Sequence, residues 1–427
     1  MTSVVATNQT ILVVGGGISG MTAALEAAET GKQVVLVEKN PYLGGRTVQL
    51  YRYFPKMCHP TCGLEINLRR LKANPRIQVL TLAEVTGISG GKGDYRVSVK
   101  LKPRYVNTNC TACGECGKAV QSEIDDEFNY NLGKIKAAYL PSSMAYPQRY
   151  VIDPSIIGTP DADRAKAACK YNAVNLDDQE EVISLNAGAI VWATGWQPYA
   201  AEKIVYYGYD RFPNVITNVE FERLADPHGP TGGKILRPSD GKEAKNVAFI
   251  QCAGSRDENH LRHCSRFCCM ASLKQTHYVQ EAFGDAGKST IYYIDIRAID
   301  RFEDFYQKVK ANPNVSFVKS KVARITQDGQ GNPVCNGVDV EGYKRYATAH
   351  DLVVLAVGME PSVKGIDIPA EVMSDSSGFI MADPANAGIF GAGCATNALD
   401  VNRAVQSATA AALRAIQVVN KVARAEA

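Results

Sequence analysis

The stretch ILVVGGGISGMTAALEAAETGKQVVLVEK, which runs from Ile11 to Lys39, decides the fold. It opens with an apolar run typical of a buried strand and continues with an alanine-rich segment that predicts a helix. A second apolar run follows and ends at Glu38. A strand, a helix and a strand in this order form a βαβ unit, and such units build parallel sheets. The sequence therefore predicts an α/β protein.

The turn between the first strand and the helix carries the pattern G-x-G-x-x-G as Gly15, Gly17 and Gly20. The first glycine allows a tight turn, the second lets the backbone approach a pyrophosphate, and the third lets the helix pack on the strand. Free N–H groups at the helix N-terminus favour a diphosphate. Glu38 would accept a hydrogen bond from a ribose hydroxyl, with Lys39 beside it. A glycine triplet alone is weak evidence, but all parts of the unit agree on a dinucleotide site.

Three further segments resemble flavoproteins with two dinucleotide-binding domains, of the thioredoxin and disulfide reductase type. They are EKNPYLGGR (38–46), AIVWATGWQP (189–198) and GIFGAGCATNALDVNRAVQ (388–406). The matching residues are Gly44, Gly45, Arg46, Thr194, Gly195, Gly391 and Gly393, with a long helix expected from about Asp400 and Val401. In such proteins the last helix faces the flavin with its N-terminus, where its dipole stabilises the reduced anion. The resemblance therefore favours FAD over NAD. Cys394 departs from it, because relatives carry an Asp there.

Composition limits the other possibilities. The chain has 427 residues, 45% of them hydrophobic, and a net charge of +3 without a Lys/Arg block. We therefore expect two or more lobes, no nucleic-acid partner and no membrane surface. The N-terminus shows no signal sequence, and no apolar run is long enough to span a bilayer. These features predict a cytoplasmic protein, where cysteines bind metal or do redox chemistry more often than they form disulfides.

Ten of the 12 cysteines occur in groups, and one group lies in a second strand–turn–helix–strand pattern at 246–297. A second glycine-rich turn is expected there, yet only Gly254 remains of it, which argues against NAD(P)H. Thiolates are the ligands that an iron–sulfur cluster needs, and a helix N-terminus would lower their pKa. The alternative is a vicinal dithiol or ordinary buried cysteines. The four residues, here called the corner quartet, are Cys252, Cys264, Cys268 and Cys269.

The flavin pattern is interrupted at about 103–176 by a segment similar to bacterial ferredoxins. NCTACGECGKAVQ (109–121) has the C-x2-C-x2-C spacing, and CKYNAV (169–174) resembles the distant motif that supplies a fourth ligand. Val120 stands where a further cysteine is expected, so we expect one [4Fe–4S] cluster and not two. The alternative is a degenerate insert whose thiols are buried or bind zinc. The four residues, here called the insert quartet, are Cys110, Cys113, Cys116 and Cys169.

Along nearly its whole length the chain resembles the A-type subunits of heterodisulfide reductase. QCAGSRD…HCSRFCC (251–269) and FPKMCHPTCGL (54–64) carry the resemblance together with the flavin segments. It implies that the corner quartet holds a [4Fe–4S] cluster close to the flavin. Cys58 and Cys62 could be orphaned ligands, a redox dithiol or ligands completed by a partner, and the sequence does not choose between them. Cys335 and Cys394 stand alone and are expected in the core.

The resemblance also implies a function. We expect an electron-transfer subunit that couples two-electron thiol and disulfide chemistry to one-electron clusters. The short chain looks like the heterodisulfide-reductase-like complex of sulfur oxidation, with B- and C-type subunits and a lipoate-binding protein as partners. A homodimer is also expected. One alternative is an NAD(P)H-dependent disulfide or polysulfide reductase that uses Cys268 and Cys269. Another is a scaffold or sensor with purely structural clusters.

The expected domain division follows from these segments. A first FAD-binding segment covers 1–102, the ferredoxin-like insert 103–176, and a return and connection 177–240. A second Rossmann-like lobe with the corner quartet covers 241–348, and the last FAD-binding segment covers 349–427.

Overall fold

The computed structural model describes the chain except residues 1–3, 5, 366–367, 371, 382–386 and 427. The chain forms two compact units, which are described separately below. Unit 1 comprises Met1–Val48, Thr61–Trp196 and Pro361–Ala427, and unit 2 comprises Gln49–Pro60 and Gln197–Glu360.

Unit 1 is built on a five-stranded parallel sheet in the order β22-β11-β1-β2-β3. The strands are β1 (Ile11–Val14), β2 (Val34–Glu38), β3 (Ile77–Thr81), β11 (Ala189–Trp192) and β22 (Ile389–Gly391). Every residue of β1, β2 and β11 is buried, as expected for a parallel sheet covered on both faces.

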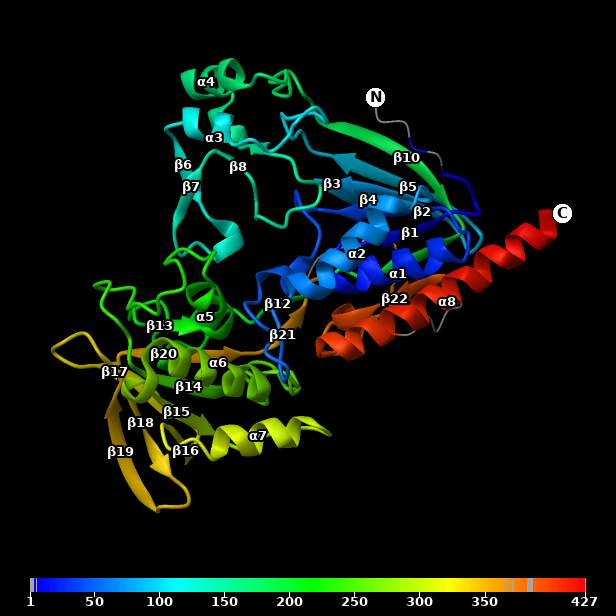
Figure 1. Ribbon diagram of the computed structural model, residues 1–427. Coiled ribbons are helices and arrows are strands. Elements are labelled where there is room, and N and C mark those ends of the chain that lie inside the picture. Colours follow the sequence, from blue (N-terminus) through cyan, green and yellow to red (C-terminus); the bar gives the residue numbers. More distant parts are fainter. Residues whose placement is uncertain (1–3, 5, 366–367, 371, 382–386, 427) are drawn as a thin grey trace. The chain divides into compact units, whose positions relative to one another are not determined.

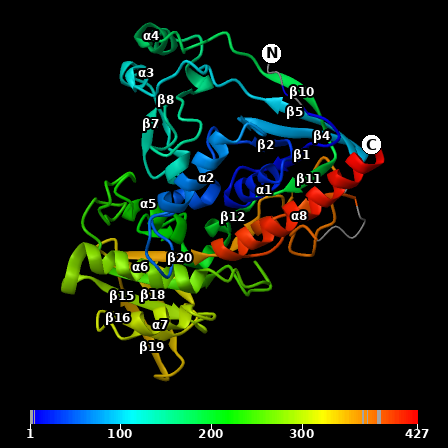
Figure 2. The same cartoon turned by 45° about the vertical axis from the view of Figure 1, so that its right-hand side comes forward.

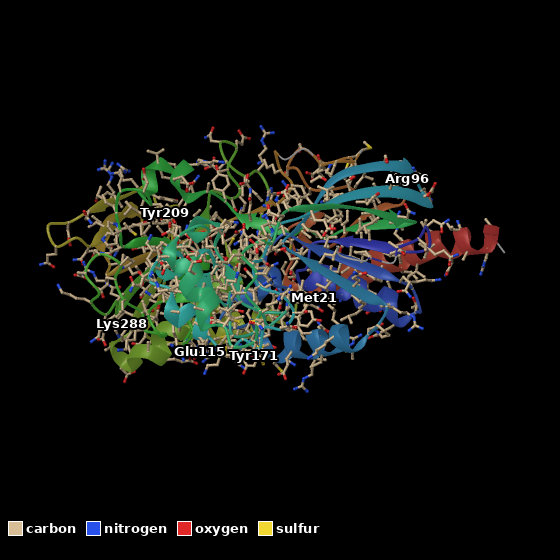
Figure 3. The ribbon with its side chains drawn as sticks, turned by 90° about the horizontal axis from the view of Figure 1, so that it is seen from above. Met21, Arg96, Glu115, Tyr171, Tyr209 and Lys288 are labelled. Atoms are coloured by element: carbon tan, nitrogen blue, oxygen red, sulfur yellow. The ribbon has the colours of Figure 1, made fainter. Side chains whose placement is uncertain are left out.

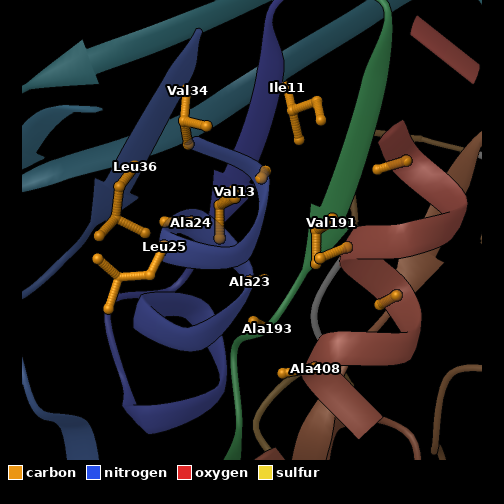
Figure 4. Packing of buried hydrophobic residues seen from close by; sticks show 14 of the residues in the cluster. Ile11, Val13, Ala23, Ala24, Leu25, Val34, Leu36, Val191, Ala193 and Ala408 are labelled. Atoms are coloured by element: carbon orange, nitrogen blue, oxygen red, sulfur yellow. The ribbon is translucent and has the colours of Figure 1, made fainter. Parts of the chain in front are cut away.

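One face of this sheet is covered by α1 (Ile18–Glu29) and α8 (Val401–Glu426), and α2 (Thr61–Ala73) packs against α1. Figure 2 shows α8, in red, alongside α1, in blue. Alanines of the two helices pack with strand residues, among them Ala23, Ala24 and Ala408 (Figure 4). These small side chains allow a close helix–sheet approach, so the N-terminal ends of both helices can reach the carboxyl edge of the sheet.

The other face of the sheet packs against an antiparallel sheet in the order β10-β5-β4. Its strands are β4 (Ala83–Gly91), β5 (Asp94–Leu101) and β10 (Glu181–Ala187). Since β5 and β10 pair along their length, the residues between them form an excursion from a hairpin. This excursion is the predicted insert.

The insert has a small hydrophobic core of its own that includes Cys116 and Val120. Its helices α3 (Glu115–Ala119) and α4 (Pro160–Ala168) pack together. Glu115 on α3 and Tyr171 after α4 are labelled in Figure 3. The strands are β6 (Glu123–Asp125), β7 (Lys134–Lys136), β8 (Ala138–Tyr139) and β9 (Val151–Ile152), paired as β6-β7 and β8-β9.

Unit 2 contains a second five-stranded parallel sheet in the order β13-β20-β14-β15-β16. The strands are β13 (Val215–Thr217), β14 (Asn246–Ala253), β15 (Lys288–Tyr293), β16 (Val315–Lys319) and β20 (Leu352–Val357). The helix α6 (Cys268–Phe283) packs on β14, β15 and β20 (Figure 1), between α5 (Asn218–Ala225) and α7 (Phe302–Lys310).

The remaining elements are short. A three-stranded antiparallel sheet consists of β17 (Arg324–Gln327), β18 (Pro333–Asp339) and β19 (Lys344–Ala349), and β12 (Trp196–Pro198) pairs with β21 (Met359–Pro361). Turns of 3₁₀ helix lie at Gly45–Gln49, Glu127–Asn129, Pro154–Ile156, Ala201–Lys203, Val205–Tyr207, Gly284–Ala286 and Gly393–Ala395.

The predicted strand–helix–strand order is confirmed in both units, but the units divide the chain differently from the expected domains. Residues 197–240 and 349–360 belong to unit 2 and not to the flavin lobe, because β13 pairs with β20 in the second sheet. Residues 49–60 also belong to unit 2. Within the described residues, every helix is too short or too polar to cross a bilayer.

Candidate functional site

The glycine-rich turn after β1 has the geometry that its sequence predicts. Gly15 has φ +105°, and a Cβ added there would lie 2.4 Å from the carbonyl oxygen of Ala193. A Cβ on Gly20 would lie 1.7 Å from the carbonyl oxygen of Gly15. A Cβ on Gly17, in contrast, would meet only the Cα of Gly45, at 3.8 Å, among the described residues. The first and third glycines are therefore needed for packing, while the second keeps open space.

The helix α1 begins directly after Gly17 and has no side chain that caps its N-terminus. The first N–H groups of a helix have no partner inside it. The amides of this first turn can therefore bind a diphosphate, as expected.

Glu38, at the end of β2, is only 5% exposed and uses both carboxylate oxygens. Oε2 accepts a hydrogen bond of 2.6 Å from the N–H of Gly16, and Oε1 accepts one of 2.8 Å from the N–H of Asn40. Burial raises the pKa of Glu38, and these two N–H groups oppose the rise. Glu38 thus holds the glycine turn in place. Its contact with a ribose stays a prediction, and the neighbouring Lys39 is exposed.

The predicted second phosphate loop lies against the first one. Gly44 and Gly17 form a bridge, and a Cβ on Gly45 would lie 2.9 Å from the Cα of Gly17. The Arg46 guanidinium donates to the carbonyl oxygen of Trp196 at 3.3 Å and to the hydroxyl of Tyr130 at 3.1 Å. Arg46 is therefore fixed beside the glycine turn, where an anionic ligand would meet it.

Thr194 follows β11 and has a buried hydroxyl with no hydrogen-bond partner among the described residues. Gly195 next to it has φ +73°. Buried polar atoms are nearly always hydrogen-bonded, so the Thr194 hydroxyl is suited to a bound ligand. This unpaired atom and the open space at Gly17 fit a dinucleotide such as FAD.

The long C-terminal helix begins at Val401, as predicted. Gly393 has φ +63°, and its N–H donates to the Ser407 hydroxyl at 3.0 Å. The Asp400 carboxylate accepts a hydrogen bond of 3.0 Å from the N–H of Arg403, so it caps the helix. Cys394 is buried, and its thiol donates to the carbonyl of Leu399 at 3.4 Å. The expectation of a core residue is confirmed for Cys394, and also for Cys335, which is fully buried.

In unit 2, all four residues of the corner quartet line one small pocket. Cys252 ends β14 with φ +54°, and Cys268 and Cys269 open α6. The other residues that line the pocket are Ser255, Arg256, Ser265, Arg266, Asp295 and Arg297. The structure thus brings together four thiols from a strand end, a loop and a helix N-terminus.

Several N–H donors point at these sulfur atoms. The Arg266 N–H lies 3.4 Å from the sulfur of Cys264, and Arg266 itself has φ +61°. The Arg256 side chain donates to Cys252, and the Arg297 N–H donates to Cys269. Donors to sulfur and nearby positive charge stabilise an anionic thiolate cluster.

The pKa values of the buried thiols contradict one expectation. We expected the N-terminus of α6 to lower them. Instead, burial raises all three pKa values. The pKa of Cys252 is raised, the pKa of Cys269 is raised to about 12, and the pKa of Cys268 is raised well above its usual value. Desolvation of a thiolate outweighs the N–H groups at the start of the helix, and metal coordination would favour the thiolate form.

The same corner offers no glycine-lined path for a second dinucleotide. A Cβ on Gly254 would lie 2.7 Å from the ring of Tyr199, so protein atoms already fill this approach. Two histidines near this corner, His260 and His263, form hydrogen bonds with other protein groups. The Tyr199 hydroxyl lies 2.8 Å from Nδ1 of His260, and Nε2 of His263 lies 2.9 Å from the carbonyl oxygen of Met359.

The structure also brings the insert quartet together. The thiol of Cys116 is close enough to the other three to interact with each of them electrostatically, and burial raises its pKa to about 11. The Ala112 N–H donates to Cys110 at 3.4 Å, and the Ala173 N–H donates to Cys169 at 3.3 Å. Burial alone would raise the pKa of Cys169, but N–H groups from residues 171, 173 and 174 lower it.

The two quartets share one local feature. In each, a cysteine sulfur accepts a hydrogen bond from the N–H of the residue two positions later, and that residue has a left-handed backbone conformation. The pairs are Cys110 with Ala112 (φ +55°) and Cys264 with Arg266 (φ +61°). Within the described ranges, no three His, Cys, Asp or Glu side chains are arranged to hold a single metal ion. The ligands of a multi-iron cluster stand farther apart than those of one ion, because the cluster lies between them. Each quartet supplies the four thiols that one [4Fe–4S] cluster needs.

Some site residues carried no motif and were missed from the sequence. Arg256 and Arg297 belong to this group, and Asp295 forms ion pairs with both of them. Cys58 and Cys62 are exposed and belong to different units, so their role stays open.

Comparisons with known proteins agree with this geometry. The pattern of the FAD dependent oxidoreductase family matches residues 10–65. The thioredoxin reductases of T. acidophilum and Lactococcus lactis share the fold, with TM-scores of 0.53 and 0.50 and 14% identity each. These alignments cover 98% and 97% of this chain and 100% and 99% of those chains.

Sequence similarity to longer proteins is stronger. The A-type subunit of the ferredoxin/F420H2-dependent CoB-CoM heterodisulfide reductase of Methanosarcina acetivorans is 36% identical over 96% of this chain and 53% of its own length. An iron-sulfur A-type subunit of the CoB-CoM heterodisulfide reductase of Methanopyrus kandleri is 36% identical over 95% of this chain and 63% of its own length. The chain thus spans about half to two thirds of the curated relatives it matches. It belongs to the family of heterodisulfide reductase A-type subunits.

Proposed function

We propose that this chain is the FAD- and iron–sulfur-containing electron-transfer subunit of a heterodisulfide reductase-like complex. The observation that carries the proposal is the pocket lined by the corner quartet, at the βα corner where a second dinucleotide would otherwise bind. Four converging thiols with N–H and arginine donors suit a [4Fe–4S] cluster.

FAD is proposed for the glycine turn of unit 1. The residues proposed to hold it are Gly15, Gly17, Gly20, Glu38, Lys39, Gly45, Arg46, Thr194, Gly195, Gly393 and Val401. When bound, FAD exchanges electrons singly or in pairs, so it can join two-electron thiol and disulfide chemistry to one-electron clusters. The chain's own residues bind and orient the dinucleotide.

A second cluster is proposed for the insert quartet, so the chain would hold two clusters with it and one without it. The converging thiols and their N–H donors support it. The absence of a cysteine at Val120 supports one cluster in the insert and not two.

The proposal extends to partners and setting. We propose B- and C-type subunits as partners, a homodimer, and a sulfur-oxidation complex with a lipoate-binding protein as sulfur carrier. We also propose a reducing, cytoplasmic location, where cysteines bind metal or do redox chemistry more often than they form disulfides. The relatives are named for ferredoxin, F420H2 and the CoB-CoM heterodisulfide. For this chain a thiol or disulfide substrate on a partner protein is part of the proposal.

Anaerobic reduction of the purified holoprotein tests this function against an NAD(P)H-dependent reductase. The proposal predicts that dithionite reduces flavin and clusters reversibly, while NADH and NADPH leave the flavin oxidised on the timescale of turnover. Rapid bleaching of the flavin by NAD(P)H alone would support the reductase instead. Clusters that stay oxidised at every accessible potential would support a structural scaffold.

A further inference from the structure

Arg104, at the start of the insert, is buried without a carboxylate partner. It is 5% exposed, and its guanidinium donates only to neutral oxygens, namely the carbonyls of Arg149 and Pro41 and the hydroxyl of Thr81. Burial and then the charge of Arg149 lower the pKa of Arg104 to about 9. A buried cation left in this state is costly.

Arg149, whose carbonyl accepts a hydrogen bond from Arg104, is half-buried. Burial lowers its pKa, and its Nε is buried with no hydrogen-bond partner among the described residues. Neither guanidinium forms an ion pair within the described part of the chain. The nearby Asp178 accepts the backbone N–H groups of Arg104 and Tyr105, at 3.1 and 3.3 Å. One half-buried carboxylate leaves the two cations incompletely balanced.

Both arginines lie within electrostatic range of Cys110, one member of the insert quartet. The next residue, Tyr150, has its phenol beside Cys110, Cys113 and Cys116. A [4Fe–4S] cluster with four thiolates is a dianion when oxidised and a trianion when reduced, and its potential depends on nearby charge. Such an anion would balance the charges of Arg104 and Arg149.

We propose that the buried Arg104 and the half-buried Arg149 are the counter-charges of the insert cluster and raise its reduction potential. This inference rests on the proposed cluster in the insert quartet. The cluster takes up one electron and becomes a trianion, and the arginines stabilise the added negative charge. Both are positioning residues, since neither is a ligand.

Arg104 also ties the insert to the flavin loop. Its Nη2 donates to the Pro41 carbonyl at 2.7 Å, three residues before Gly44. The insert holds the same loop through the Tyr146 carbonyl, which accepts the N–H of Leu43 at 3.0 Å. Loss of Arg104 should therefore also weaken FAD binding, while loss of Arg149 should not.

The test is a redox titration with dithionite, followed by electron paramagnetic resonance, of the full holoprotein and its variants. The insert signal is identified as the one that Cys169→Ser removes. In Arg149→Gln and Arg104→Gln, the ratio of reduced to oxidised insert cluster at a fixed potential should fall about tenfold, a shift of about 59 mV to lower potential. Arg149→Lys should keep most of the potential, because it keeps the charge.

Lys118→Gln is the matched control. It removes a positive charge from α3 of the same insert, but Lys118 is 74% exposed and paired with Glu115, so water screens it. The reduction potential of the insert cluster in Lys118→Gln should equal that of the parent protein. Equal potentials in Arg149→Gln, Arg149→Lys and the parent would overturn the inference while leaving the cluster in place. Unchanged iron and signals in Cys169→Ser would instead refute the proposed insert cluster itself.

Discussion

Gly17 and Gly45 face each other across the two phosphate loops of unit 1, and the space beside Gly17 is left open by the protein. A Cβ on Gly17 would have the Gly45 Cα, 3.8 Å away, as its sole close contact among the described residues. A glycine that no protein contact requires indicates that something else comes close to the backbone. We propose that this group is the pyrophosphate of FAD.

Gly17→Ala should separate folding from cofactor binding. The added methyl meets no protein clash, so the free energy of unfolding of the apoprotein should change by less than about 1 kcal/mol. The same methyl blocks the close approach of the pyrophosphate, so the affinity for FAD should fall at least about tenfold. Denaturant unfolding and flavin fluorescence titration measure the two effects.

Gly20→Ala is the contrasting variant. Its Cβ would lie 1.7 Å from the Gly15 carbonyl oxygen. This clash should lower the free energy of unfolding of the apoprotein by about 3 kcal/mol or more, as in severe overpacking. Full FAD affinity in Gly17→Ala would show that the dinucleotide does not bind at this turn.

Thr194→Val should weaken FAD binding without harming the apoprotein. The hydroxyl is buried and unpaired in the described structure, so removing it should leave apoprotein stability unchanged or slightly raised. Losing one hydrogen bond to the ligand should lower FAD affinity about five- to tenfold, or about 1–1.4 kcal/mol. Thr194→Ser, which keeps the hydroxyl, should bind like the parent. Equal affinities in all three proteins would remove Thr194 from the site.

Lys274 and Glu222 form a buried ion pair between α6 and α5, with an N–O distance of 2.8 Å. The Lys274 Nζ also donates to the carbonyl of Arg52 at 2.7 Å, which holds segment 49–60 on α6. Lys274→Met removes the counter-charge of the buried Glu222 carboxylate, so it should destabilise the protein by about 3 kcal/mol. The carboxylate keeps its hydrogen bonds from the Tyr51 N–H, the Gln275 amide and the Tyr278 hydroxyl. Adding Glu222→Gln removes the uncompensated charge but keeps an amide oxygen as acceptor, so it should recover part of this loss. Chemical unfolding of the two variants decides, and a double variant no better than the single one would contradict this explanation.

His350 should make stability depend on acid pH. It is buried in unit 2 between Tyr292 and Asn246, and burial lowers its pKa from 6.5 to about 4. The folded state therefore keeps His350 neutral while the unfolded state binds a proton below about pH 6.5. The contribution of neutral His350 to the free energy of unfolding is therefore fully present above pH 6.5. It decreases as the pH falls towards 4, by up to about 3 kcal/mol in all.

His350→Gln removes the titrating group, so its stability should fall less steeply over this range. Urea unfolding at several pH values measures the slope. The same slope in both proteins would assign the acid sensitivity to other groups.

Much of the fold could be predicted because its signals are local. The glycine turn, the end of β2 at Glu38 and the start of α8 at Val401 follow from patterns within a few residues. The domain boundaries did not follow, because β13 is a strand of three residues whose place depends on pairing with β20. The members of each quartet were grouped from motifs and from the family resemblance, and the structure brings the members of each quartet together. Arg104 and Arg149, however, lie 45 positions apart and meet only through the fold, and the thiol pKa values depend on burial, which spacing does not report.

The most direct test of the central claim is the iron and sulfide content of Cys264→Ser, compared with the parent and with Cys335→Ser. Cys335 is a buried cysteine outside both quartets, so its replacement controls for the loss of a thiol. We predict that Cys264→Ser loses about four iron atoms per chain, the content of one cluster, together with one paramagnetic signal of the reduced protein. We also predict that Cys335→Ser keeps both. Parent-like iron and an unchanged spectrum in Cys264→Ser would contradict the claim that thiolates of the corner quartet hold a cluster.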